Sequence, residues 1–321
     1  MEVKAKKPSN ERVLISIVCP TFNEEQNVEE LYNRILRVLS GHDLQFEVIF
    51  IDNASTDTTV EKLRSIASRD SRVKLILNAR NFGHIRSPYY GLLQAHGDAV
   101  VLMASDLQDP PEMLTDFIES WQEGNKVVLA VKSSTDEKWT WRIIRRSYYS
   151  FVSRLSSDPL VKNATGAGLF DKAVVDELRK LKEPYPYFRG LVTELGFRVN
   201  TIDFHQPNRK SGKTKNNFFT LYDMAILGIT THSGAPMRII SIFGFCVAVL
   251  SLLVALGYLV AKLLFWDSFQ MGFAPLILGV FFFGSLQISL IGLLGEYLAN
   301  IQRRIRNMPL VIEDERVNFE K

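Results

Sequence analysis

Three polar side chains follow an apolar run in the first half of the chain and form its clearest candidate for chemistry. Asp106, Gln108 and Asp109 come directly after residues 98–104, which we expect to form a buried strand. A carboxylate and an amide oxygen two residues apart suit Mg²⁺ or Mn²⁺, hard ions that keep waters and bridge to a diphosphate. We therefore predict Asp106 and Gln108 as metal ligands.

Some of the neighbouring acids have a simpler explanation in helix capping. Asp109, followed by two prolines and then Glu112, has the form of a capping box, so we predict Asp109 as the N-cap of the next helix. The run from Thr58 to Glu61 is a second capping box, which leaves Asp57 open as either a turn acid or a ligand. Asn23 is likewise open between capping a helix and facing a ligand.

The elements that must position these residues alternate between short apolar runs and helical patterns. This alternation predicts an α/β fold, a mostly parallel sheet covered on both faces, in which ligands bind beyond the carboxyl ends of the strands. Polar clusters do follow the runs, beginning at Pro20, Asp52, Arg80 and Ser105. The expected strands cover residues 13–19, 46–52, 73–78, 98–104 and 126–131, and a helix is expected over 28–39.

Composition excludes several classes of protein. The net charge of +3 over 321 residues does not indicate a nucleic-acid binder. The two cysteines, Cys19 and Cys246, fall in a predicted strand and a predicted membrane segment, so we expect no disulfide, consistent with a reducing compartment. The charged N-terminal residues have no apolar run behind them, so we do not expect them to form a signal peptide. There is no GxGxxG or P-loop, so a phosphate ligand needs a metal or basic side chains.

The C-terminal third carries two apolar stretches, residues 239–265 and 273–294, each long enough to span a bilayer. Arg238 precedes them and Arg303, Arg304 and Arg306 follow, so the positive-inside rule predicts a two-helix hairpin with both termini in the cytoplasm. The alternative is a pair of buried helices in a soluble protein.

The motifs PTFNEE, IDNASTD, RNFGH and SDLQDPPE occur in this order over residues 13–112. This ordered set resembles family-two glycosyltransferases, and the chain as a whole resembles their polyprenyl-phosphate glycosyltransferase type. The resemblance implies the GT-A fold, a nucleotide-diphosphate sugar donor and inversion at the anomeric centre. It also implies a nucleotide site that comprises Pro20, Thr21, Asn23, Glu24, Asp52, Asn53, Gly83 and Asp106.

Two positions depart from the family pattern. Asp106 and Gln108 match the metal-binding D-x-D-x-Q motif, but Ala104 stands where its first acid is expected. Residues 163–171 depart from the pattern of many relatives, which carry an acid and an F-R pair in this stretch, so no catalytic base is assigned there.

The acceptor that the resemblance implies needs no such base. A polyprenyl phosphate is already anionic near pH 7, with a second pKa of about 6, so its oxygen can attack the sugar directly. The protein must instead hold two anions together, which requires basic residues. By the same resemblance, Lys132 and Arg189 are predicted beside Asp106 as catalytic residues. The loop with Arg209, Ser211, Lys213 and Lys215 resembles the R-x-x-G-x-S/T-K loop of such enzymes, which implies that it binds phosphates. The alternative for this cluster is a juxtamembrane patch that binds anionic lipid headgroups.

Together with these features, the resemblance implies a glycosyltransferase of the inner or plasma membrane that transfers one hexose to undecaprenyl phosphate or a similar lipid. The resemblance alone, and no particular residue, implies that the hexose is glucose from UDP-glucose. The alternatives are a GDP-mannose-dependent mannose synthase and a non-catalytic nucleotide-sugar-binding scaffold, for which Ala104 is the best argument. We expect a catalytic domain over 1–215, a juxtamembrane amphipathic helix over 216–235, the membrane helices over 236–300 and a cytosolic tail over 301–321. A second interfacial helix is expected over 139–155, and the glycines at 279, 284, 292 and 295 make a homo-oligomer possible.

Overall fold

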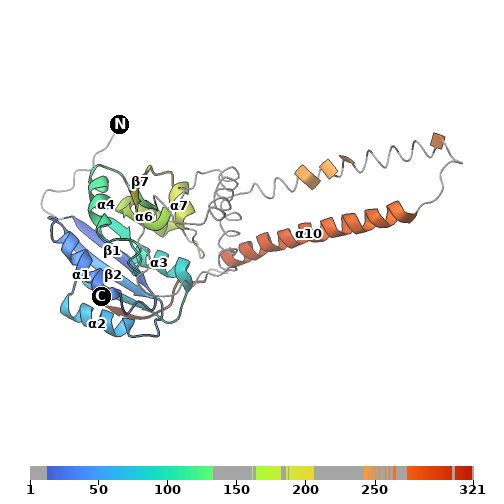
Figure 1. Cartoon of the computed structure of the whole chain (residues 1–321). Coiled ribbons are helices and arrows are strands. Elements are labelled where there is room, and N and C mark those ends of the chain that lie inside the picture. The colour runs from blue at the N-terminus through green and yellow to red at the C-terminus, as the bar shows by residue number, and fades with distance from the viewer. Residues whose placement is uncertain are drawn as a thin grey trace.

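A computed structural model of the chain describes residues 13–132, 161, 164–181, 186, 188–205, 273–305 and 308–319, with isolated positions between 242 and 264 (Figure 1). Both expected interfacial helices, over 139–155 and 216–235, lie outside the described residues. The same holds for Arg209, Ser211, Lys213 and Lys215. The expected division of the chain into domains stays a prediction.

The core of the molecule is one eight-stranded sheet with the order β7-β5-β6-β4-β1-β2-β3-β8. Strands β1, β2, β3 and β4 are mutually parallel, and β5 and β7 share their direction because β6 is antiparallel to both β4 and β5. The mostly parallel α/β sheet is therefore confirmed. The strands are β1 (Leu14–Thr21), β2 (Gln45–Asp52), β3 (Val73–Asn78), β4 (Ala99–Leu102), β5 (Val127–Lys132), β6 (Ala164–Asp171), β7 (Val199–Phe204) and β8 (Glu313–Val317).

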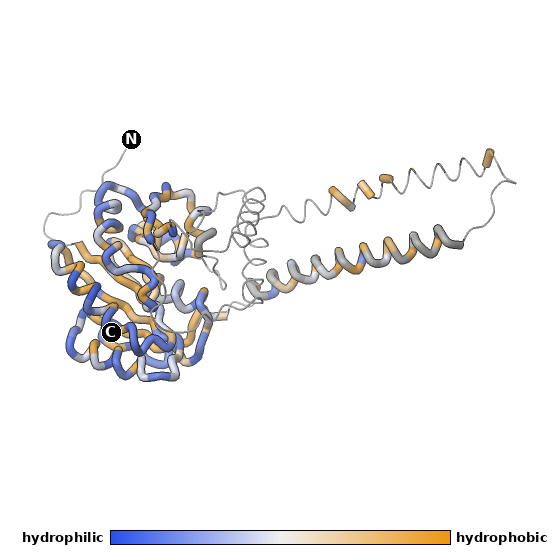
Figure 2. The backbone as a smooth tube through the Cα atoms, in the orientation of Figure 1, coloured by the Kyte–Doolittle hydropathy of each residue, from blue (hydrophilic) through white to orange (hydrophobic). Residues whose placement is uncertain are grey.

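Helices cover both faces of the sheet because the strands are apolar on both faces. In β1, Ile15 and Ile17 pack on one face and Val18 on the other, all fully buried. The first face is covered by α1 (Val28–Leu39), α2 (Thr59–Arg69) and α4 (Met113–Gln122). The second face is covered by α3 (Gly83–Gln94), α6 (Lys172–Lys180) and α7 (Phe188–Glu194). Figure 2 shows the hydrophobic strands enclosed by helices with hydrophilic outer sides.

One long helix, α10 (Phe273–Ile305), extends away from the sheet domain (Figure 1). Its 33 residues correspond to about 50 Å, more than the roughly 30 Å of a bilayer core. Its window Phe282–Ala299 has a mean hydropathy of 1.3 with no buried residue, so this helix meets the length and composition of a membrane span. It is the only such helix among the described residues. The expected second span, residues 273–294, is thus a helix that continues to Ile305.

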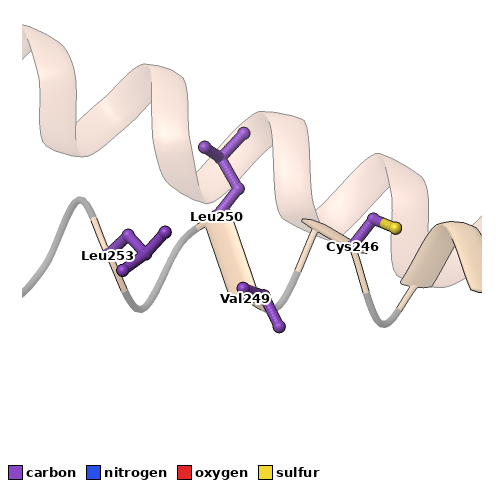
Figure 3. A pocket seen from close by; sticks show the side chains of 4 residues that line it. All are labelled: Cys246, Val249, Leu250 and Leu253. Carbon is purple, nitrogen blue, oxygen red and sulfur yellow. The ribbon is translucent and has the colours of Figure 1, made fainter.

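The first expected span, residues 239–265, falls mostly outside the described residues, so the structure leaves the two-helix hairpin unconfirmed. Its described positions are helical and expose large apolar side chains, among them Ile242 and Leu264. A pocket of about 280 Å³ is lined by four residues of this segment, Cys246, Val249, Leu250 and Leu253 (Figure 3). None of these four side chains is charged, so this pocket is not a nucleotide site. Cys246 and the buried Cys19 are both free thiols, as expected.

Candidate active site

The sheet has a topological switch point between β1 and β4. From β1 the chain proceeds to β2 and β3 on one side, whereas β4 lies on the other side and is also parallel to β1. In open parallel sheets ligands bind in the crevice at the carboxyl ends of two such strands. Here that crevice lies between Thr21, which ends β1, and the segment from Met103 to Asp106 after β4.

Two buried hydroxyl groups join the strand ends at this crevice. The Thr21 hydroxyl donates to the carbonyl oxygen of Cys19 at 3.0 Å and lies 2.8 Å from the Ser105 hydroxyl. A hydroxyl has a single proton, so Ser105 donates to Thr21. The bridge fixes the start of the Ser105–Asp106 turn against β1. Thr21, predicted to line the nucleotide site, therefore lies at the crevice with its hydroxyl engaged in this bridge.

The backbone is strained at three of the four central strand ends. Asn23, Ala54 and Leu107 have φ angles of 55°, 62° and 59° and follow β1, β2 and β4. The left-handed region costs a non-glycine residue about 1–2 kcal/mol, and only Asn adopts it readily. Strain of this kind persists where the surrounding structure enforces it, most often at ligand-binding loops. Here the three residues lie at the edge of the sheet where the ordered motifs predict the site of the nucleotide-sugar donor.

The loops after β1 and β2 are joined directly. The Asn23 backbone N–H donates to the Ser55 hydroxyl and its side-chain oxygen accepts from the Thr56 N–H, both at 2.8 Å. The Glu24 N–H donates to the Thr59 hydroxyl at 2.9 Å. Asn23 thus holds the two loops together rather than capping α1, whose N-cap is Asn27. Pro20 and Glu24, both half-buried, belong to the same edge of the sheet.

The carboxyl group of Asp52 closes the turn after β2. It is 1% exposed and accepts hydrogen bonds from the backbone N–H of Ser55 at 2.8 Å and from the Ser55 hydroxyl. Burial raises the pKa of Asp52 above its ordinary value, and the Ser55 hydrogen bonds oppose this shift. Both oxygens are therefore used within the turn, and the contact with a nucleotide stays a prediction.

Asn53, in the loop after β2, is bonded to the end of β3 and to the loop that follows β3. Its side-chain oxygen accepts from Phe82 N–H at 2.9 Å and from Asn78 at 3.2 Å. Its amide group donates to Asn81 at 2.9 Å and to the Gly83 carbonyl at 3.4 Å. Gly83, the first residue of α3, has a φ of 88°, which favours glycine. Asn53 and Gly83 are thus brought together, as the scaffold of the loop over residues 79–83.

The turn after β4 presents Asp106 and Gln108, both half-buried, beside the crevice. The Gln108 backbone N–H donates to one Asp106 carboxylate oxygen at 3.1 Å. Among the described residues no group of three or more His, Cys, Asp or Glu side chains is placed to hold a metal. The donor set that the sequence predicts, one carboxylate and one amide oxygen, fits a hard ion that takes its other ligands from water and phosphate. Its binding of a metal stays a prediction.

The predicted capping box at Asp109 is wrong. The two prolines form a turn first, with the Met113 N–H bonded to the Pro110 carbonyl at 3.0 Å, so α4 begins at Met113 and has Glu112 as its N-cap. The Glu112 carboxylate instead forms a salt bridge with Arg34 of α1, at 2.5 Å. Asp109 is buried before the helix begins, at 6% exposure.

The second capping box also fails, and its outcome decides the role of Asp57. The Thr58 hydroxyl donates to Glu25 at 2.7 Å, whereas Asp57 accepts from the Thr59 N–H at 3.0 Å at the start of α2. Of the two alternatives left open for Asp57, a turn acid or a ligand, these hydrogen bonds support the turn acid.

The predicted basic residues are only partly located. Lys132 ends β5 and is half-buried at the same edge of the sheet as Asp106, two strands from β4, which corresponds to about 10 Å. Arg189 belongs to α7, although its side chain is outside the described part. Arg80, to which the sequence analysis gave no role, follows β3, with its guanidinium 4.4 Å from the ring centre of Phe82. In the sequence, only its place in the motif RNFGH could have indicated Arg80 as a candidate site residue.

The sequence profile of glycosyl transferase family 2 matches residues 16–179, about half of the chain. The chain belongs to glycosyl transferase family 2. An uncharacterized glycosyltransferase of Bacillus subtilis is 32% identical over 95% of this chain and 94% of its own length. A prophage-derived bactoprenol glucosyl transferase of Shigella flexneri is 30% identical over 93% and 96%. The bactoprenol glucosyl transferase of Shigella phage SfV is 30% identical over 94% and 99%.

Among solved structures, glucosyl-3-phosphoglycerate synthase of Mycobacterium tuberculosis in complex with Mn²⁺ and UDP is 20% identical, with a TM-score of 0.47, over 68% of this chain and 78% of that protein. At this level the similarity adds nothing to the sheet order described above. In this family-2 enzyme the ordered motifs lie at the carboxyl edge of a mostly parallel sheet, as predicted.

Proposed function

We propose that this glycosyltransferase transfers one glucosyl residue from UDP-glucose to a polyprenyl phosphate, with inversion at the anomeric carbon. The observation that carries the proposal is the similarity to bactoprenol glucosyl transferases, about 30% identical over more than nine tenths of the chain. The strained strand-end loops at the switch point support a nucleotide-sugar site in the matching part of the sheet.

The reaction is a single displacement at the sugar. An oxygen of the lipid phosphate forms a bond to C1 of glucose while the bond from C1 to the UDP diphosphate breaks, and UDP leaves with the electron pair. The acceptor oxygen carries no proton to remove at neutral pH, so no general base is required. The protein contributes by orienting the two reactants and by stabilising the charge of the leaving diphosphate.

Asp106 and Gln108 would hold a Mg²⁺ or Mn²⁺ ion at the β4 edge. When bound, the ion neutralises charge on the leaving diphosphate. Ala104 removes one carboxylate from this set, so the diphosphate must supply more of the coordination. Lys132, Arg189 and the loop with Arg209, Ser211, Lys213 and Lys215 would bring the lipid phosphate to the sugar.

Membrane attachment is supported by the path of the chain. The apolar side chains of Val280, Ile288 and Ile305, which are spread along α10, are exposed. Figure 2 shows α10 extending from the sheet domain with hydrophobic positions along its described part. Strands β1 to β8 form one sheet, so β7 before α10 and β8 after it lie on the same side of any membrane. If α10 crosses once, residues 206–272 must cross as well, which supports the two-helix hairpin. An added Cβ at Gly284 or Gly292 of α10 would have no neighbour within 4 Å, so these positions are open to a second copy.

A panel of donors tests the proposal. Purified protein in liposomes is supplied with Mg²⁺, undecaprenyl phosphate and either UDP-glucose, GDP-mannose or other nucleotide sugars, and the lipid products are identified by mass. We expect one hexose added from UDP-glucose. If only GDP-mannose gives a product, the sugar transferred would be mannose and not the proposed glucose. Binding of UDP-glucose without product from any donor would indicate a non-catalytic scaffold.

A further inference from the structure

The chain does not end as a separate tail after α10. Residues 308–319, which we call the C-terminal strap, return to the sheet, where β8 pairs antiparallel with β3 in the register Leu77↔Glu315 and Leu75↔Val317. Strand β8 thereby covers the edge of the sheet that β3 would otherwise expose. Figure 1 shows α10 ending beside α3 and the C-terminus lying near α2.

The direction of the strap places its membrane-proximal end at the site. Because β8 is antiparallel to β3, its start lies at the carboxyl end of β3, where the Ala79 N–H donates to the Ile312 carbonyl at 3.0 Å. Just before this point, the guanidinium of Arg86 on α3 donates to the Pro309 carbonyl. The chain therefore passes from α10 directly to the edge of the sheet that carries the donor loops.

Arg86 also connects the strap with one of those loops. Its guanidinium lies 5.4 Å from the ring centre of Phe82, within the range of a cation–π interaction. The backbone N–H of Phe82 is the group that Asn53 holds at the end of β2. A continuous set of contacts thus leads from Pro309 through Arg86 and Phe82 to Asn53.

The far end of the strap is attached to α2 and β3. Glu315 forms a two-pronged ion pair with Arg64, at 2.8 and 2.5 Å. The Asn318 amide donates to the carbonyls of Ala67 and Val73, both at 2.8 Å, which satisfies a carbonyl in the last turn of α2. Contacts at both ends keep the strap from sliding along β3.

The link between the strap and α10 is short. Only residues 306–308 separate Ile305, the end of α10, from Pro309. Four Cα steps reach at most about 14 Å, so the donor edge of the sheet cannot move far from the end of α10. A lipid phosphate stays at the membrane surface, and attack at C1 needs the reacting atoms about 3–3.5 Å apart.

We propose that the C-terminal strap is a positioning element, with Arg86 as its positioning residue, that holds the donor site against the membrane surface so that a lipid phosphate reaches the sugar. This inference rests on the proposed function for its acceptor. The strap acts on delivery of the acceptor and leaves binding of the donor unchanged.

Lengthening the link tests this directly. Insertion of Gly-Ser-Gly-Ser between Met308 and Pro309 adds up to about 13 Å of reach while leaving β8 and its contacts in the sequence. The matched control carries the same insertion between Phe319 and Glu320, beyond the strap. A second pair consists of Arg86→Ala, which removes the bond to Pro309, and Arg86→Lys, which retains a donor.

Two readouts are compared in full-length protein in nanodiscs. Transfer to undecaprenyl phosphate should fall at least tenfold in the link insertion and several-fold in Arg86→Ala, while UDP-glucose affinity stays within twofold. The control insertion and Arg86→Lys should resemble the wild type. Energy transfer from a dye at Gln26→Cys, in a Cys246→Ser background, to dye-labelled headgroups should fall in the link insertion and, to a smaller extent, in Arg86→Ala. It should stay unchanged in the control insertion and in Arg86→Lys.

The outcomes separate the two proposals. Unchanged energy transfer in the link insertion, or unchanged lipid glycosylation despite reduced energy transfer, would overturn the role of the strap. Reduced energy transfer in a protein that makes no glycolipid even as wild type would support the strap and overturn the proposed function instead. Equal loss of UDP-glucose affinity in the link insertion would also overturn the strap, because it would indicate a damaged donor site.

Discussion

Replacing Asn53 by Ala tests whether this side chain is the scaffold of the donor loops. The substitution removes four hydrogen bonds, to Phe82, Asn78, Asn81 and Gly83. It also leaves the N–H of Phe82, a residue that is 8% exposed, without the acceptor that it uses.

The expected loss of stability follows from these contacts. A buried donor that loses its partner costs about 1–3 kcal/mol, and each further hydrogen bond contributes about 0.5–1.5 kcal/mol net. The two hydrogen bonds that the Asn53 amide group donates, to Asn81 and Gly83, lie near the surface, where water can replace part of the lost hydrogen bonding. We therefore expect a total of roughly 2–4 kcal/mol, which lowers the melting temperature by roughly 5–15 °C in a domain of this size.

The assay is thermal unfolding of the purified protein together with UDP binding by calorimetry. Asn33→Ala, at an exposed position on α1, is the matched control and should leave both values unchanged. UDP affinity should fall more than tenfold in Asn53→Ala, because the loop over residues 79–83 loses its attachment to β2. A melting temperature within 1 °C of the wild type, with unchanged UDP affinity, would refute the scaffold role of Asn53.

Three further predictions concern the metal, the close packing of the sheet and the dependence of stability on pH. Ala104→Asp restores the missing acid, so we expect the affinity for Mn²⁺ in the absence of nucleotide to rise about tenfold, as measured by electron paramagnetic resonance. Asp106→Asn should abolish Mn²⁺ binding. Equal Mn²⁺ affinity in Ala104→Asp and the wild type would argue against an ion at this turn. Gly97→Ala places a Cβ 2.7 Å from the Ser16 hydroxyl and 2.8 Å from the Leu14 carbonyl. The melting temperature should therefore fall by an amount equivalent to about 1–3 kcal/mol. The control Gly41→Ala, whose Cβ has only an ordinary contact at 3.6 Å, should leave the melting temperature unchanged. The hydrogen bond from Arg72, together with that from Tyr32, lowers the pKa of Asp70 from 3.8 to about 2. This interaction stabilises the fold above pH 4 and is lost as the pH falls towards 2, so Asp70→Asn should lower the melting temperature at pH 6 but not at pH 2, and parallel pH curves for the two proteins would contradict this.

Most of the central sheet could be predicted from the sequence because its strands are buried on both faces. The run over residues 73–78 is β3 without a change of boundary, and the expected helix over 28–39 is α1. Continuous apolar runs of this kind have few alternative structures. The rule that ligands bind at the carboxyl ends of such strands then predicted the polar clusters that follow each run.

The strap could not be predicted in the same way. Strand β8 has the sequence EDERV, which lacks the apolar alternation of a half-buried strand. Its pairing depends on the exposed edge of β3, a property of the assembled sheet and not of the local sequence. Charged residues such as Glu315 then find partners, here Arg64, that lie far away in the chain.

The site shows the same division between local and long-range information. Residue types after each strand indicated where ligands bind, but which polar groups are used by neighbouring loops depends on contacts across the sheet. Asp52 and Asn53 were predicted to face a nucleotide, yet Ser55 and the loop over residues 79–83 occupy their hydrogen-bonding groups. The capping box at Asp109 failed because the two prolines form a turn before α4 begins at Met113, and Glu112 pairs with Arg34 of α1, a partner that local spacing does not reveal.

The central claim is most directly tested by a single turnover in liposomes that contain undecaprenyl phosphate, using UDP-glucose labelled with ¹³C at C1. We expect one labelled glucose joined to the lipid phosphate with the opposite anomeric configuration, in the wild type and in Asp116→Asn, a variant at an exposed acid on α4. Asp106→Asn should give no product. Binding of labelled UDP-glucose by the wild type without transfer to the lipid, or transfer with retained configuration, would contradict the account.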